Sequence, residues 1–113
     1  MKGKIIRKKE LNKSDYGVIK VIEYITKNNN KNFSLALIEL NGKNRKIKNE
    51  LSDAFYFVIE GDGKFFLNGE EYQVGEGDLV CIQKGTSYFD EGKLKMVSIA
   101  TPPFDREYVI ELE

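Results

Sequence analysis

The chain has 113 residues and a mass of 13.0 kDa, which allows one domain and leaves no room for a second. Its 18 basic residues balance its 18 acidic residues, so the formal net charge is zero, which argues against nucleic acid as a partner. Histidine is absent. That absence excludes a Ser–His or Cys–His nucleophile, an imidazole proton shuttle and a metal site built on imidazole.

The cysteine content and the first residues bear on the cellular compartment. Cys81 is the single cysteine, so no intrachain disulfide can form and the chain suits a reducing environment. The segment from Met1 to Glu10 is charged and lacks the apolar run of a signal peptide. No stretch approaches the roughly 18 apolar residues of a spanning helix. We therefore expect a cytoplasmic protein without a membrane partner.

The first third of the chain predicts two strands joined by a polar turn. Residues 17–25 and 33–40 are rich in β-branched and aromatic side chains, which suit a pleated sheet. The asparagine-rich stretch 28–32 between them is typical of a turn. Asn41-Gly42 ends the second run, and this dipeptide favours a tight hairpin.

The rest of the chain continues the succession of short apolar runs and turns. Further strands are predicted at residues 54–59, 64–67, 72–74, 78–82 and 94–100. Asn68-Gly69 is a second hairpin signal. Strands recur about every ten residues, and no window longer than about ten residues has helical periodicity. The pattern therefore predicts an all-β domain, either a sandwich or a closed barrel.

Two segments of the chain resemble the short sequence motifs of the cupin superfamily, whose members are small β-barrels of the jelly-roll type. The first segment covers about residues 42–61. The second covers residues 77–92, with Gly77 and Gly85 at the spacing of the family motif. The tail, residues 101–113, resembles the segment that follows the barrel in many small cupins. The resemblance implies that all 113 residues form a single small cupin-type β-barrel.

The resemblance also locates the positions at which cupins bind metal, with three histidines and one glutamate. In this chain the glutamate position holds Ala54 and one histidine position holds Tyr88. First-row divalent metals need imidazole, thiolate or several carboxylates that converge on one point. We therefore expect no metal and no other cofactor.

Two registers are open for the remaining histidine positions of the first motif. With a gap of four residues they fall on Ile47 and Asn49. With a gap of three residues they fall on Lys48 and Glu50. Neither pair supplies the donor set of a cupin metal site, so the metal activities of the family are not expected in either register.

Several polar side chains in or near the two motifs are candidates for binding a small molecule. They are Lys48, Asn49, Tyr56, Tyr88 and Arg106. The tyrosines are equally compatible with packing in the core, and lysines and arginines are usually solvated surface charges. Arg106, in a tail that crosses the barrel mouth, would suit a carboxylate or a phosphate.

Three functions fit such a barrel. The leading hypothesis is a metal-free protein that binds a small polar metabolite, such as a sugar, without catalysis. The alternative is a metal-independent sugar or sugar-phosphate isomerase or epimerase, in which Tyr88 and Glu50 replace the inward histidine that such cupins use. The third is a structural or interaction protein whose barrel is filled by its own side chains.

The strand at residues 54–59 also predicts an interface. Side chains alternate along a strand, so Phe55, Phe57 and Ile59 lie on the face opposite Tyr56. In contact with water, this row would be an apolar patch too large for a monomer. Small cupins commonly pair through their sheet faces, and we expect a homodimer on that resemblance.

Overall fold

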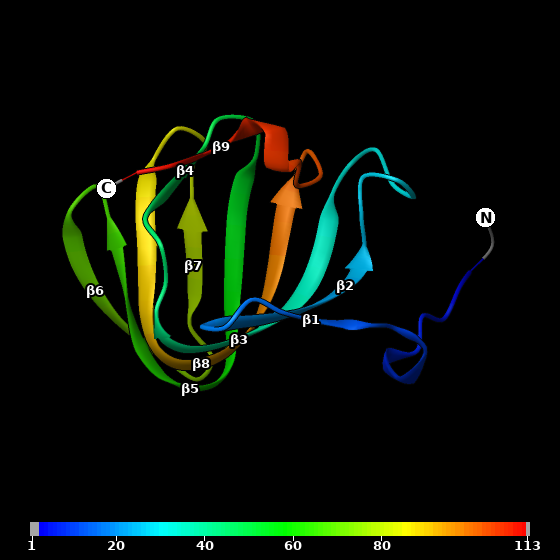
Figure 1. The fold of residues 1–113 in the computed structure, drawn as a ribbon, viewed down its shortest axis with the longest axis horizontal. Helices are drawn as coiled ribbons and strands as arrows, with labels where there is room; N and C mark the ends of the chain where they lie inside the picture. The colour runs from blue at the N-terminus through cyan, green and yellow to red at the C-terminus, as the bar shows by residue number, and fades with distance from the viewer. Residues whose placement is uncertain (1–2, 113) are drawn as a thin grey trace.

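The structure is a computed structural model that describes residues 3–112. The secondary-structure elements of these residues are η1 (Lys8–Glu10), β1 (Lys13–Asp15), β2 (Ile19–Ile25), β3 (Ser34–Lys43), β4 (Ile47–Asn49), β5 (Asp53–Leu67), β6 (Glu70–Gly75), β7 (Leu79–Ile82), β8 (Ser87–Thr101), η2 (Arg106–Tyr108) and β9 (Val109–Glu111). All the strands belong to one curled sheet, so the predicted all-β class is confirmed (Figure 1).

Two long strands organise the sheet. β5 and β8 pair antiparallel along their whole length, from Asp53↔Thr101 to Leu67↔Tyr88. The other edge of β8 pairs with β3 and β4, and the other edge of β5 pairs with β7 and β6. Both long strands bend sharply at the bottom of Figure 1, so the sheet turns back on itself and encloses a concave side.

Glycines lie in both long strands where the sheet bends. Gly61 in β5 and Gly92 in β8 have φ values of +101° and +133°, which side chains with a Cβ rarely adopt. A Cβ on Gly92 would also lie 2.6 Å from the Cα of Gly63, closer than real Cβ contacts. The close approach of the two backbones therefore requires glycine at this position.

The two Asn-Gly dipeptides have different outcomes. Asn68-Gly69 forms the predicted two-residue hairpin between β5 and β6, with φ values of 49° and 84°. The hairpin predicted at Asn41-Gly42 is wrong, because both residues continue β3 and pair with Lys93 and Gly92 of β8. Pairing with a distant strand outweighs the local turn preference here.

The buried core lies between the two halves of the bent strands. Val58, Phe65 and Met96 have no exposed surface, and Leu40 and Leu94 are almost completely buried beside them. On the opposite, outer face of the sheet, Phe57 and Leu79 remain 45% and 57% exposed. Within residues 3–112, no helix is long and apolar enough to cross a membrane.

Candidate ligand-binding cavity

The concave side of the sheet encloses a cavity of about 740 Å³. Side chains of β2, β3, β4, β5 and β8 form its walls, and residues of the tail that follows β8 reach its rim. The barrel interior is therefore not filled by its own side chains. This observation removes the basis of the filled-barrel hypothesis.

The cavity decides between the two registers of the first motif. Ile47, Asn49, Ala54 and Tyr88 all line it, as the gap of four residues requires. Lys48 and Glu50 do not line it, because their side chains alternate with those of Ile47 and Asn49. The cavity lining therefore favours the gap of four residues.

The residues at the family's metal-binding positions do not fit a metal ion. An alkyl chain, an amide, a methyl group and a phenol stand where cupins have three imidazoles and a carboxylate. Asn49 is further committed to its own backbone, since its Oδ1 accepts hydrogen bonds of 2.9 Å from the N–H groups of Leu51 and Ser52. Nowhere in residues 3–112 do three His, Cys, Asp or Glu side chains form a group that could hold a metal.

Two tyrosines are joined in the cavity wall. The hydroxyl oxygens of Tyr56 on β5 and Tyr88 on β8 lie 2.7 Å apart, and either can donate the hydrogen bond. Burial raises the pKa of Tyr88 to about 12 and raises the pKa of Tyr56 well above its usual value of 10. Both phenols therefore keep their protons at neutral pH, one of which is used between them and the other of which is available to a ligand.

A carboxyl group lies on the same wall. Asp90 follows Tyr88 by two residues on β8, so both side chains are on the concave face, and Asp90 is only 4% exposed. Burial raises the pKa of Asp90 to about 6, although a hydrogen bond from Asn44 opposes that rise. We call Tyr56, Tyr88 and Asp90 the polar wall of the cavity.

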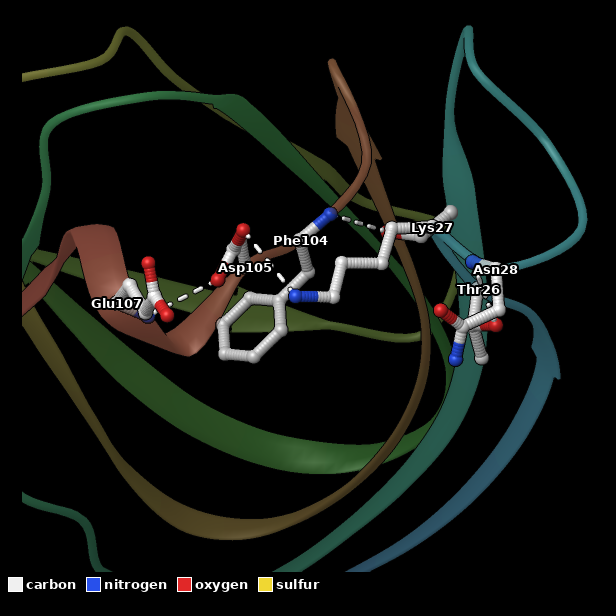
Figure 2. A network of polar contacts seen from close by, with 7 residues as sticks. Thr26, Lys27, Asn28, Phe104, Asp105 and Glu107 are labelled. Atoms are coloured by element: carbon white, nitrogen blue, oxygen red, sulfur yellow. Dashed lines mark hydrogen bonds and ion pairs between the residues drawn. The ribbon is translucent and has the colours of Figure 1, made fainter.

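The tail supplies the exposed rim of the cavity. Phe104 and Arg106 both line the opening, and the ring of Phe104 is turned towards the concave side (Figure 2). Arg106 forms no ion pair with any residue in the part of the chain that the structure describes. Its guanidinium is therefore free to meet a negatively charged group at the rim.

Two contacts fix the tail over the opening. The backbone N–H of Phe104 donates a hydrogen bond of 2.9 Å to Ser34 Oγ at the start of β3. Asp105 forms an ion pair of 3.2 Å with Lys27, in the loop that follows β2 (Figure 2). We call these two contacts the clasp, because they join the tail to the turn between β2 and β3.

The structure brings four of the predicted ligand-binding residues to one cavity. Asn49, Tyr56, Tyr88 and Arg106 line it. Lys48 does not line it, and neither does Glu50, the predicted catalytic partner of Tyr88. Lys48 alternates with Ile47 and Asn49 along β4, and Glu50 follows the end of that strand, which accounts for their absence from the lining.

Sequence reasoning missed two residues of this site. Asp90 would have been found by extending the predicted strand back from Leu94 to Tyr88, because alternation then places Tyr88 and Asp90 on one face. Phe104 carries no such signal, since the tail has no strand pattern and only the folded chain shows that it crosses the opening.

We compared the chain with known protein families, sequences and structures. No family model matches the chain. A protein of unknown function from Aquifex aeolicus is 27% identical over 107 residues, which cover 92% of this chain and 88% of that one. The solved structure of Pac13, a nucleoside dehydratase from Streptomyces, is 20% identical with a TM-score of 0.90, covering 98% of this chain and 92% of its own.

Two further solved structures have the same shape at lower identity. Ectoine synthase from P. lautus is 16% identical with a TM-score of 0.81, covering 98% of this chain and 91% of its own. KdgF from Halomonas sp. is 16% identical with a TM-score of 0.80, covering 93% and 98%. These likenesses confirm what the two sequence motifs suggested, and the chain has the cupin fold.

Proposed function

We propose that the cavity binds a small hydroxylated metabolite, of the sugar or nucleoside class, without a metal ion. The observation that carries this function is the polar wall, where two neutral phenols and a carboxyl group face an open space. Phenol O–H groups donate to a ligand hydroxyl and a carboxylate accepts from one, so together they match a carbon chain with neighbouring hydroxyls. Binding of this kind requires no reaction of the ligand.

The size of the cavity supports a ligand larger than a bare sugar ring. Pockets of roughly 300–1,000 Å³ hold drug-sized molecules, and this cavity measures about 740 Å³. A sugar that contacts the polar wall leaves space towards the rim, where Phe104 and Arg106 lie. An aromatic ring and a guanidinium suit a planar base or an acidic group on that sugar.

The fold comparison supports the same ligand class. Pac13 is a nucleoside dehydratase, and variants of it with a tyrosine or a histidine replaced have been solved with uridine. A barrel of this shape is therefore compatible with a nucleoside ligand. This chain has no histidine, so the phenols and the carboxyl group of its polar wall would contact the ligand instead.

Binding can be tested in two steps. Native mass spectrometry of freshly purified protein should show a protein without a stoichiometric metal adduct, and an organic adduct would identify a retained ligand. Isothermal titration with uridine and with D-ribose should then show binding that weakens about two- to tenfold in Tyr56→Phe or Tyr88→Phe, since each loses one hydrogen bond.

Tyr72→Phe is the matched control, because Tyr72 is an exposed tyrosine on β6 that does not line the cavity. Its affinity for uridine should equal that of the unaltered protein. Equal affinities for all three variants, or a stoichiometric metal adduct, would contradict the proposed function.

We also propose that the outer face of the sheet pairs with a second copy of the chain. Phe57, Ile59 and Leu79 are 45%, 38% and 57% exposed on neighbouring strands β5 and β7, which is unusual for large apolar side chains of a monomer. Phe57→Asp should convert a dimer into a monomer in light scattering at micromolar concentration. Ile110→Asp, at an exposed apolar position on β9, should leave the dimer intact. A monomeric unaltered protein would disprove this interface.

A further inference from the structure

Asp90 is a buried acid that lines the cavity. Its side chain is 4% exposed, and its cross-strand neighbour on β5 is Phe65, which is fully buried. A carboxyl group in such surroundings lowers stability unless it is paired, and an apolar residue would pack there at no such cost. Buried acids that line a cavity are candidates for function on this ground.

Within residues 3–112, no cation neutralises this acid. The other charged side chains that line the same cavity are Lys43, Arg45, Arg106, Glu23 and Glu111. Arg45 pairs with Glu111 at 2.6 Å, and the Lys43 ammonium lies 5.1 Å from the centre of the Phe89 ring. Among residues 3–112, no lysine or arginine forms an ion pair with Asp90. Asn44, which lines the same cavity, donates a hydrogen bond to this carboxyl group but carries no charge, so the acid has a polar partner and no cationic one.

The phenol pair stands next to this base. Tyr88 and Asp90 are on the same face of β8, and Tyr56 is hydrogen-bonded to Tyr88 from the neighbouring strand. One of the two hydroxyl protons is used between the tyrosines, and the other can be donated to the ligand. A carboxyl group and a neutral donor thus line the same wall of the cavity, and proton transfer at carbon uses groups of these two kinds.

We propose that Asp90 acts as a general base that removes the proton from the carbon next to the carbonyl group of a hydroxylated aldehyde or ketone, while the Tyr56–Tyr88 pair donates a hydrogen bond to the carbonyl oxygen. This activity rests on the ligand binding proposed above, and adds a reaction to it. The base is a residue that neither the family motifs nor the sequence pattern had indicated.

The proton and electron balance is closed within the site. The carbon–hydrogen bond breaks and its proton forms an O–H bond on Asp90. The electron pair becomes the carbon–carbon double bond of an enolate, whose negative oxygen the phenol stabilises. Return of a proton from Asp90 to the carbon restores the carbonyl compound. If the enolate turns over before the proton returns, the configuration at that carbon is inverted. No oxidant, reductant or second substrate is consumed.

Covalent catalysis by cysteine and catalysis by a metal ion have less support in this cavity. A covalent route needs a nucleophile with a base beside it, and Cys81 lies exposed on β7, outside the cavity lining. The residues at the metal-binding positions do not fit a metal ion. Proton transfer, in contrast, needs only the base and the donor that this wall provides. Such a base accelerates a reaction by about 10²–10⁴-fold.

Deuterium exchange tests this activity directly. The full-length protein is incubated in D₂O near neutral pH with dihydroxyacetone or with D-glyceraldehyde, and ¹H NMR follows the loss of the proton next to the carbonyl. Saturation-transfer NMR on the same samples reports binding. We expect exchange faster than in buffer alone, a fall of about 100-fold or to the buffer rate in Asp90→Asn, and a fall of about tenfold or more in Tyr88→Phe.

Glu91→Gln is the matched control, since Glu91 is the next residue on β8 and does not line the cavity. It should exchange deuterium at the rate of the unaltered protein. Retained binding of the two compounds by Asp90→Asn would show that this variant is folded and has lost the reaction alone. Binding without exchange in the unaltered protein would overturn the activity and leave the binding function standing. Absence of both binding and exchange would contradict both.

Discussion

The polar wall and the rim of the cavity are built in opposite ways. Tyr88 and Asp90 are 5% and 4% exposed, on a strand that is hydrogen-bonded to neighbours on both edges. Phe104 is 44% exposed, and the tail that carries it depends on the clasp of one hydrogen bond and one ion pair. The wall therefore holds its groups in fixed positions, whereas the rim can yield when a ligand enters or leaves.

The same contrast governs the electrostatics of the two regions. In the polar wall, burial dominates and raises the pKa of all three groups. At the rim, the pKa of Asp105 is lowered, chiefly by a hydrogen bond from the backbone N–H of Glu107 and further by Lys27. The wall thus carries two phenols that stay neutral and one carboxyl group that titrates near pH 6, whereas the lowered pKa of Asp105 keeps that rim carboxylate charged.

The largest expected effect comes from removing the apolar support of the polar wall. Phe65 has no exposed surface, and its ring centre lies 5.3 Å from that of Tyr56. Phe65→Ala should lower the free energy of unfolding by about 3–5 kcal/mol, measured by urea denaturation. Phe104→Ala, at the rim, should cost about 1 kcal/mol or less. Equal losses would show that the wall is no better supported than the rim.

The buried acid makes stability depend on pH. Folding raises the pKa of Asp90 from 3.8 to about 6, so between about pH 4 and pH 6 the folded state binds more protons than the unfolded state. Stability contributed by this group is therefore full below about pH 4 and is lost as the pH rises to about 6. A shift of about two pKa units corresponds to about 3 kcal/mol.

Asp90→Asn isolates this contribution. Glu39 and Asp105 have lowered pKa values and oppose the trend, but they are present in both proteins and cancel in the comparison. Urea denaturation from pH 4 to pH 7.5 should show the variant gaining stability relative to the unaltered protein as the pH rises, with a plateau above about pH 6. If the two stability curves run parallel with pH, folding does not raise the pKa of Asp90.

The fold was largely predictable because strand patterns are local. Most predicted runs lie within observed strands, and Asn68-Gly69 forms its hairpin. The errors concern pairing over long distances. The runs at 54–59 and 64–67 are one strand, β5, because β8 pairs with all of it. The short strand β4 exists through pairing with β8 and β9, and β9 through pairing with β4. Nothing in their own sequences demands a strand.

The site was predictable where a side chain belongs to the strand pattern of the barrel. Tyr56 and Tyr88 face the cavity as alternation and the motif spacing indicated. Their distance of 2.7 Å was not predictable, since it depends on the register of β5 against β8. The rim was still harder to predict. Phe104 is held by Ser34, and its neighbour Asp105 is held by Lys27, and both partners lie about 70 residues or more away in the sequence.

The smallest expected effect concerns the clasp, and it separates access from stability. Lys27→Met removes the ion pair with Asp105, in which the lysine side chain is 51% exposed, so stability should fall by less than about 1 kcal/mol. Because the clasp fixes the tail over the opening, a bound ligand such as uridine should dissociate faster from this variant, as NMR exchange measurements can show. Lys64→Met is the matched control, since Lys64 forms an exposed ion pair with Glu71 across β5 and β6, and neither residue lines the cavity. An equal change in dissociation rate in both variants would mean that the tail does not control access to the cavity. A faster dissociation in Lys27→Met alone would show that the rim controls how the ligand enters and leaves, while the polar wall recognises it.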